Sequence, residues 1–170
     1  MNDTSPKILQ PLADPVRDGL ARGWKVIDAS SPGRDLTLET DIAIVGTGAG
    51  GGIAAEILAD AGLRVLMIEE GPLKSSTDFR MREADAYRDL YQESAARKTA
   101  DKAINILQGR CVGGGTTVNW TSSFRTPAAT LAHWQSTHGW SRDGAADLAP
   151  WFDRVEARLG IAPWPIAPNA

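Results

Sequence analysis

The sequence feature that most constrains the fold is a short apolar segment that runs directly into closely spaced glycines. Residues 41–45 read Asp-Ile-Ala-Ile-Val, and Gly46, Gly48 and Gly51 follow them in a G-x-G-x-x-G pattern. A short β-branched run of this kind is typical of a buried parallel strand. The glycines predict a tight turn from that strand into a helix, and dinucleotides bind their phosphates at such turns.

The residues that follow continue the same unit. Apolar side chains recur at helical spacing over residues 53–61, Gly62 is placed to end the helix, and residues 65–68 form a second apolar run. A strand, helix and strand joined in this way are parallel and right-handed in nearly all cases. We therefore predict a βαβ unit over residues 41–70 and an α/β fold of the Rossmann type.

The turn has a separate predicted role for each of its patterned glycines. Gly46 permits the sharp exit from the strand, Gly48 leaves room for a pyrophosphate to approach the backbone, and Gly51 lets the helix pack closely on the strand. The N–H groups at the start of the helix would face the phosphates. The predicted nucleotide-binding residues of this turn are Gly46, Thr47, Gly48, Ala49, Gly50 and Gly51.

An acidic residue completes this first pattern. Glu69 stands at the end of the second apolar run, close to the spacing of about 20 residues at which an acid binds the ribose hydroxyls of an adenosine. A carboxylate there would repel a 2′-phosphate, which argues against NADP. NAD and FAD share the adenosine diphosphate half, so the pattern alone does not distinguish them.

A second glycine-rich segment lies downstream. Residues 109–119 read Gly-Arg-Cys-Val-Gly-Gly-Gly-Thr-Thr-Val-Asn, and three adjacent glycines can present successive N–H groups to an anion. The segment resembles the flavin-holding segment of the glucose-methanol-choline (GMC) oxidoreductases, and residues 65–72 and 133–156 resemble further stretches of that family. The resemblance covers nearly all of residues 20–170 and is closest to the branch of long-chain fatty alcohol oxidases and related bacterial dehydrogenases.

The resemblance implies a cofactor and a site. It implies FAD, held in this segment by Gly109, Arg110, Gly113, Gly114, Gly115, Thr116, Thr117 and Asn119. Asn119 can hydrogen-bond toward the polar rim of the flavin ring. Some family members attach FAD covalently through a histidine at the position of Val118, and valine cannot form that bond. We therefore expect non-covalent FAD.

The resemblance also implies an activity. Family members oxidise a CH–OH group of an alcohol by transferring a hydride to the flavin, so we expect an FAD-dependent oxidoreductase whose full-length form acts on a small-molecule alcohol substrate. No residue here matches the family's catalytic motif, so we expect no catalytic residue and no catalysis by this chain alone. The alternatives are a complete small NAD-binding dehydrogenase and a non-enzymatic flavin-binding subunit that needs a complementary C-terminal chain. The alcohol and the electron acceptor stay open.

Composition excludes other classes. The 170 residues carry a formal net charge of −3 without a cluster of Lys or Arg, which argues against a nucleic-acid partner. Cys111 is the single cysteine, so an internal disulfide and a multi-cysteine metal site are excluded, and we interpret it as a small apolar filler. We expect no metal. No signal peptide or membrane span is evident, so we expect a cytoplasmic protein.

We divide the chain into three parts. Residues 1–40 are expected to form an arm with two short strands, 24–30 and 36–39, and residues 41–127 to bind FAD. Residues 128–170 are expected to carry two helices, at about 128–137 and 144–159, with a tryptophan core, as the start of a truncated remainder. We thus predict an incomplete Rossmann-type FAD/NAD(P)-binding domain with a helix-rich C-terminal segment. A surface helix with an apolar seam is predicted within residues 76–98.

Overall fold

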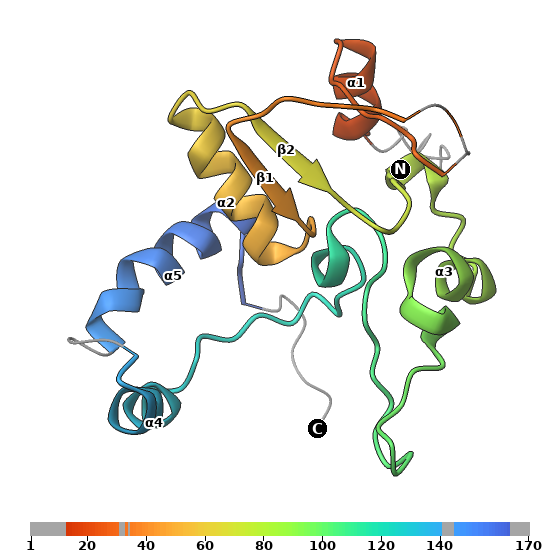
Figure 1. Ribbon diagram of the computed structural model, residues 1–170. Helices are drawn as coiled ribbons and strands as arrows, with labels where there is room; N and C mark the ends of the chain where they lie inside the picture. The colour runs from red at the N-terminus through yellow and green to blue at the C-terminus, as the bar shows by residue number, and fades with distance from the viewer. Residues whose placement is uncertain (1–12, 31–32, 34, 141–144, 164–170) are drawn as a thin grey trace, which may run out of the picture. The chain divides into compact units, whose positions relative to one another are not determined.

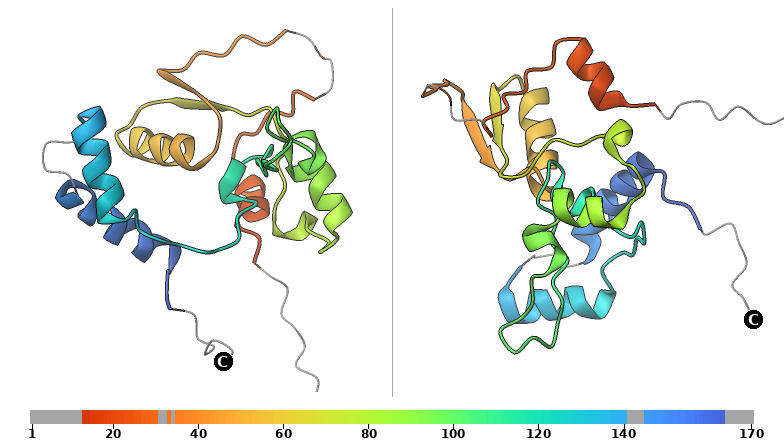
Figure 2. Two further views of the ribbon diagram at one scale, coloured as in Figure 1. Left: turned by 90° about the horizontal axis from the view of Figure 1, so that it is seen from below. Right: turned by 90° about the vertical axis from the view of Figure 1, so that its right-hand side faces the viewer.

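The computed structural model describes residues 13–30, 33, 35–140 and 145–163. The chain divides into two compact units, Met1–Asn119 and Trp120–Ala170, and each is described by itself. Figures 1 and 2 show the elements of each unit. Among the described helices, none is both long and apolar enough to cross a membrane.

The first unit is built on a βαβ motif. Strand β1 (Ile42–Val45) pairs in parallel with β2 (Val65–Ile68), in a register that sets Ile42 opposite Val65. Helix α2 (Ala49–Asp60) connects the two strands and packs against both of them (Figure 1). The predicted parallel βαβ unit and the Rossmann-type α/β fold class are confirmed.

Glycines shape the connections of this motif. Gly46 has a φ of +94°, a region open mainly to glycine, and its N–H donates to the carbonyl of Ile68 at 2.8 Å. A Cβ on Gly51 would overlap the carbonyl oxygen of Gly46, so the predicted close approach of helix to strand is confirmed. Gly62, at φ +87°, follows α2 and donates to the carbonyl of Ala59, as expected at a helix end.

The buried carboxylate of Asp14 hydrogen-bonds to the chain after β2 and so holds the N-terminal helix in contact with it. Asp14 precedes α1 (Pro15–Ala21) and is 7% exposed. It accepts hydrogen bonds from the Arg17 N–H, the Ser75 hydroxyl and both the N–H and the hydroxyl of Thr77. Burial opposes ionisation of Asp14, but these hydrogen bonds outweigh it and lower the pKa of the carboxyl. Thr77 belongs to the 3₁₀ turn η1 (Ser76–Asp78).

The two strands expected in the arm do not form. Residues 24–29 and 35–40 are extended but pair with no other strand, and residues 31–32 and 34 of the expected turn lie outside the described residues. Trp24 and Leu36 are 57% and 54% exposed. Alternating apolar residues become a strand only where a neighbour supplies hydrogen bonds, and here no described segment does so.

The predicted helix within residues 76–98 is shorter than expected. Helix α3 covers Glu83–Leu90, and a 3₁₀ turn, η2, covers Gln92–Ala95. Met81 and Ala95 have φ values of 53° and 66°, so the chain leaves the helical conformation on either side. Residues 92–108 then form a hairpin arm, closed by antiparallel bridges at Tyr91–Gly109 and Lys98–Asn105 (Figure 1).

The described residues of the second unit form two helices, as predicted. Helix α4 covers Ala128–His138 and α5 covers Ala145–Leu159. Arg125 donates to Asp153 at 2.6 Å and to Glu156 at 2.7 Å, which ties the segment before α4 to α5. The expected tryptophan core is wrong, because Trp120 and Trp151 are 82% and 54% exposed. Two helices offer too little surface to enclose several indole rings.

Candidate functional site

The two glycine-rich segments meet in the first unit. The N–H of Gly113 donates to Oγ1 of Thr47 at 2.9 Å, across 66 residues of sequence. A Cβ on Gly114 would lie 3.2 Å from Cα of Gly48, tighter than ordinary packing, so the two backbones touch where neither residue carries a side chain. The structure thus brings together the two segments that sequence analysis singled out separately.

The start of α2 is open toward this meeting point. Gly48 is the N-cap residue and provides no side-chain hydrogen bond to the helix. A Cβ added at Gly48 or at Gly50 would meet nothing within 4 Å. The first N–H groups of a helix have no partner within the helix, and they carry a partial positive charge. Gly48, Ala49 and Gly50 therefore form an uncapped helix start with free space in front of it, which suits a phosphate.

Glu69 directly follows β2 and contacts the turn. Its Oε2 accepts hydrogen bonds from the N–H of Thr47 at 2.9 Å and from the hydroxyl of Thr47 at 2.7 Å, and its Oε1 accepts one from the N–H of Gly71 at 3.1 Å. Partial burial opposes ionisation, but the hydrogen bonds from Thr47, Gly71 and Glu70 together lower the pKa of the Glu69 carboxyl. The acid beside the glycine turn is therefore ionised at neutral pH.

The second glycine segment is only partly an anion nest. The N–H of Gly113 is bonded to Thr47, and the N–H of Gly114 donates to the carbonyl of Cys111 at 2.8 Å. The N–H of Gly115 forms no hydrogen bond with any described residue. Of the three amides expected to face an anion, those of Gly113 and Gly114 donate to protein acceptors, and the N–H of Gly115 remains available to an anion.

The threonines close this segment into a tight turn. Residues Gly114–Thr116 form a single 3₁₀ turn, η3, and this turn does not continue into an α-helix. The hydroxyl of Thr117 donates to the carbonyl of Val112 at 2.8 Å, and the amide of Asn119 donates to the carbonyl of Thr116 at 2.7 Å. These side chains therefore satisfy carbonyl groups of the loop.

Backbone packing fixes the loop against the chain after β2. A Cβ on Gly71 would overlap the carbonyl of Arg110, and a Cβ on Gly109 would overlap that of Gly114. Cys111, which lies between Gly109 and Gly114 in the loop, is 0% exposed. Burial raises the pKa of its thiol, which supports its interpretation as a small apolar filler. Gly71 was not among the residues predicted for the site from the sequence; its position directly after Glu69 and Glu70 was the available signal.

Arg110 lies at the edge of the candidate site. Its Nε is 3.4 Å from Oε2 of Glu70, and its Nη2 is 3.4 Å from the carbonyl oxygen of Glu70. Glu70 is thus the partner of Arg110, and Glu69 is not. Both side chains are substantially exposed, so this ion pair adds little to stability.

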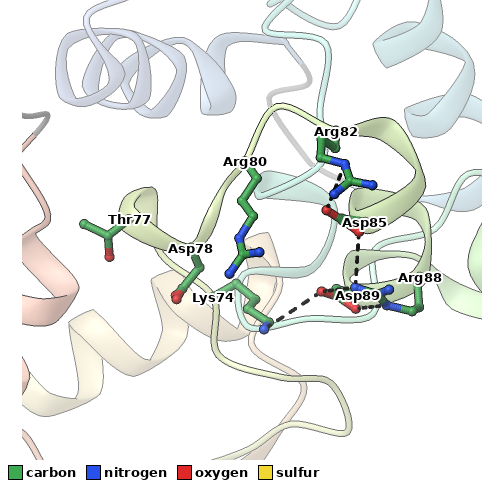
Figure 3. Close-up of a pocket in the computed structure, with 8 residues that line it drawn as sticks. All are labelled: Lys74, Thr77, Asp78, Arg80, Arg82, Asp85, Arg88 and Asp89. Carbon is green, nitrogen blue, oxygen red and sulfur yellow. Dashed lines mark hydrogen bonds and ion pairs between the residues drawn. The ribbon is translucent and has the colours of Figure 1, made fainter.

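A polar hollow in the described part of the first unit lies elsewhere (Figure 3). It has a volume of about 470 Å³ and is lined by Lys74, Thr77, Asp78, Arg80, Arg82, Asp85, Arg88 and Asp89. Its charges largely neutralise one another, as in the pairs of Arg88 with Asp85 and Asp89. No residue of either glycine segment lines it, and we therefore do not assign it to the nucleotide.

A more apolar groove adjoins that hollow. It has a volume of about 370 Å³, and Phe79, Met81 and Leu90 line it together with Thr117, Val118 and Asn119. The end of the second glycine segment therefore opens onto apolar surface. Among the described residues, no group of three or more His, Cys, Asp or Glu side chains is arranged to hold a metal ion.

A parallel βαβ motif with a glycine turn, an uncapped helix start and an acid after the second strand defines a Rossmann-type nucleotide-binding protein. A family model described as GMC oxidoreductase matches residues 87–170. The chain belongs to the GMC oxidoreductase family.

Individual relatives agree with this assignment. A long-chain-alcohol oxidase of Arabidopsis thaliana is 36% identical over 124 residues, which cover 73% of this chain and 17% of the relative. An uncharacterised GMC-type oxidoreductase of Mycobacterium tuberculosis strain H37Rv is 33% identical over 151 residues, covering 82% of this chain and 24% of the relative. The chain thus spans less than a quarter of the length of these curated relatives.

The chain is also similar to a solved structure. The crystal structure of pyridoxine 4-oxidase from Mesorbium loti is 29% identical, with a TM-score of 0.49, over 67% of this chain and 24% of that chain.

Proposed function

We propose that this chain is the FAD-binding N-terminal part of a GMC-type oxidoreductase that acts on an alcohol. The observation that carries the proposal is the meeting of the two glycine segments at the uncapped start of α2, beside an ionised acid. An FAD molecule has a pyrophosphate, an adenosine ribose and a flavin ring, and each needs a different kind of protein group. The residues present fit these needs.

The donor set matches the nucleotide part by part. The N–H groups of Gly48, Ala49 and Gly50 would hold the pyrophosphate, with the Gly115 N–H as a further donor. Glu69 would accept a ribose hydroxyl, and its negative charge disfavours a 2′-phosphate. A side chain at Gly48 would fill the free space that the phosphates need.

The flavin end would lie toward the end of the second segment. Asn119 would hydrogen-bond to the ring's polar rim, and Val118 cannot attach the flavin covalently, so we propose non-covalent binding. FAD held there would supply the hydride acceptor for oxidation of an alcohol. This chain's residues would bind and orient the nucleotide, and we assign none of them the role of catalytic base.

A ligand panel tests the proposal. Purified chain is titrated with FAD, ADP, NAD⁺ and FMN, and binding is followed by calorimetry and by flavin fluorescence. We expect FAD to bind most tightly, ADP to compete with it, and FMN, which lacks the adenosine diphosphate, to bind at least about 100-fold more weakly. Acid precipitation should release all of the flavin into the supernatant. Equal affinity for FMN and FAD, or no binding of either, would refute the proposal.

A further inference from the structure

The hydroxyl of Thr47, which lies in the first glycine turn, contacts both Glu69 and the second glycine segment. It donates to Oε2 of Glu69 at 2.7 Å and accepts the N–H of Gly113 at 2.9 Å. The N–H of Thr47 donates to the same carboxylate oxygen at 2.9 Å. Among the described residues, the bond to Gly113 is the sole hydrogen bond between residues 46–51 and residues 109–119.

The direction of these hydrogen bonds is fixed by chemistry. A hydroxyl has one proton to donate and two lone pairs that accept, and an amide N–H can only donate. The Thr47 oxygen must therefore accept from Gly113, and its proton is directed to the ionised Glu69. A chain from N–H to hydroxyl to carboxylate strengthens each of its bonds by polarisation. Valine has nearly the shape of threonine but can make neither bond.

The arrangement also decides what remains free on Glu69. Thr47 supplies two donors to Oε2, and the N–H of Gly71 donates to Oε1, while the N–H of Glu70 also stabilises the charged carboxylate. A carboxylate has about four acceptor positions, two on each oxygen. Both protons from Thr47 go to Oε2, so a ribose hydroxyl would be accepted at Oε1.

We propose that Thr47 is a positioning residue that joins the second glycine segment to the ribose-binding acid, so that the phosphate and ribose parts of the site are assembled before the nucleotide arrives. This inference rests on the proposed function for its ligand, FAD. A site held in its binding geometry loses less conformational freedom on binding, so its affinity is higher. Thr47 would contribute to affinity without any contact from its hydroxyl to the nucleotide.

Three variants separate this role from a general effect on folding. Thr47→Val removes the hydroxyl, and Thr47→Ser keeps it while removing the methyl group. Thr40→Val is the matched control, because the hydroxyl of Thr40 also hydrogen-bonds to the backbone, with the carbonyl oxygens of Arg64 and Ile42 both within reach of its single proton, but at the opposite end of β1. The variants are made in the full chain.

The first measurement needs no ligand. Hydrogen exchange of backbone amides is followed by NMR, with the Val112 N–H as an internal reference because it is bonded to the carbonyl of Pro72 at 3.0 Å. In Thr47→Val the Gly113 amide should exchange at least about 10-fold faster, since its acceptor is lost, and Val112 should be unchanged. In Thr47→Ser and Thr40→Val both amides should keep the exchange rates of the unmodified chain.

The second measurement is the dissociation constant for FAD. It should rise about 10-fold in Thr47→Val and stay within about 2-fold in Thr47→Ser and Thr40→Val, as expected for the loss of one or two hydrogen bonds. Unchanged exchange at Gly113 in Thr47→Val, or a serine variant as weak as the valine variant, overturns the inference. If Gly113 is released but FAD affinity is unchanged, the inference also fails while the proposed function stands. If the unmodified chain binds no FAD, the proposed function itself fails.

Discussion

Replacing Gly51 with alanine tests the close packing of α2 against the glycine turn at Gly46. Gly51 lies in the first turn of α2, where the helix passes over the end of β1. An added Cβ would overlap the carbonyl oxygen of Gly46 and would lie 3.1 Å from its carbonyl carbon and 3.4 Å from Cγ2 of Ile44. Two of these neighbours are backbone atoms, so the helix itself would have to shift.

Two opposing contributions set the size of the effect. Overpacking of this kind costs about 1–3 kcal/mol. Alanine is favoured over glycine inside a helix by about 1 kcal/mol, which offsets part of that cost. We expect Gly51→Ala to lower the free energy of unfolding by up to about 2 kcal/mol, and the melting temperature by up to about 8 °C.

Gly52→Ala is the matched control in the same helix turn. A Cβ there would have its nearest neighbour, the carbonyl oxygen of Thr47, at 3.9 Å, which is ordinary contact. With the helix preference unopposed, Gly52→Ala should raise the free energy of unfolding by up to about 1 kcal/mol. Urea unfolding followed by circular dichroism measures both variants. If Gly51→Ala is as stable as Gly52→Ala, the close approach of α2 to Gly46 is wrong.

Two further predictions concern charged groups outside the glycine turn. The pKa of Asp14 is lower in the folded chain than in the unfolded one, so its stabilising effect is complete above the unfolded pKa and is lost as the pH falls toward the folded value. Asp14→Asn should therefore lose less stability than the unmodified chain between pH 5 and pH 2.5 (about the range in which aspartate titrates) in urea unfolding, and equal losses would contradict the hydrogen-bond network. Arg125→Ala removes the donors to Asp153 and Glu156 and the contact of the guanidinium with the Phe152 ring. Amides of α5 should then exchange faster in NMR while those of α2 do not change, and unaltered exchange in α5 would refute a role for Arg125 in holding it.

Local patterns predicted the βαβ motif because each of its parts is decided by neighbouring residues. The apolar run before Gly46, the helical spacing after it and the glycine at position 62 need no distant information. The same local reasoning failed for residues 24–30 and 36–39, since a strand depends on a partner elsewhere in the chain. It also overextended α3, because the left-handed backbone at Met81 leaves no periodic signal.

The candidate site was predictable in its members but not in its connections. Glycine spacing and the position of Glu69 indicated which residues to consider. The bonds from Thr47 to Glu69 and from Gly113 to Thr47 join residues 22 and 66 positions apart, and only the folded backbone sets those distances. The amides of Gly113 and Gly114 donate to protein acceptors, so that of Gly115 is the one left for an anion. These hydrogen bonds also depend on the folded loop and could not be predicted from the sequence.

The measurement that tests the central claim most directly is the affinity of Gly48→Val for FAD. Gly48 has a φ of −65°, which any residue adopts, and an added Cβ meets no atom within 4 Å. Valine should therefore change the melting temperature of the ligand-free chain by no more than about 4 °C, roughly 1 kcal/mol for the lost glycine N-cap, while it fills the space assigned to the pyrophosphate. The account predicts FAD binding at least about 100-fold weaker in a variant that is otherwise folded. Unchanged affinity in that variant would contradict the claim that the two glycine segments hold the nucleotide.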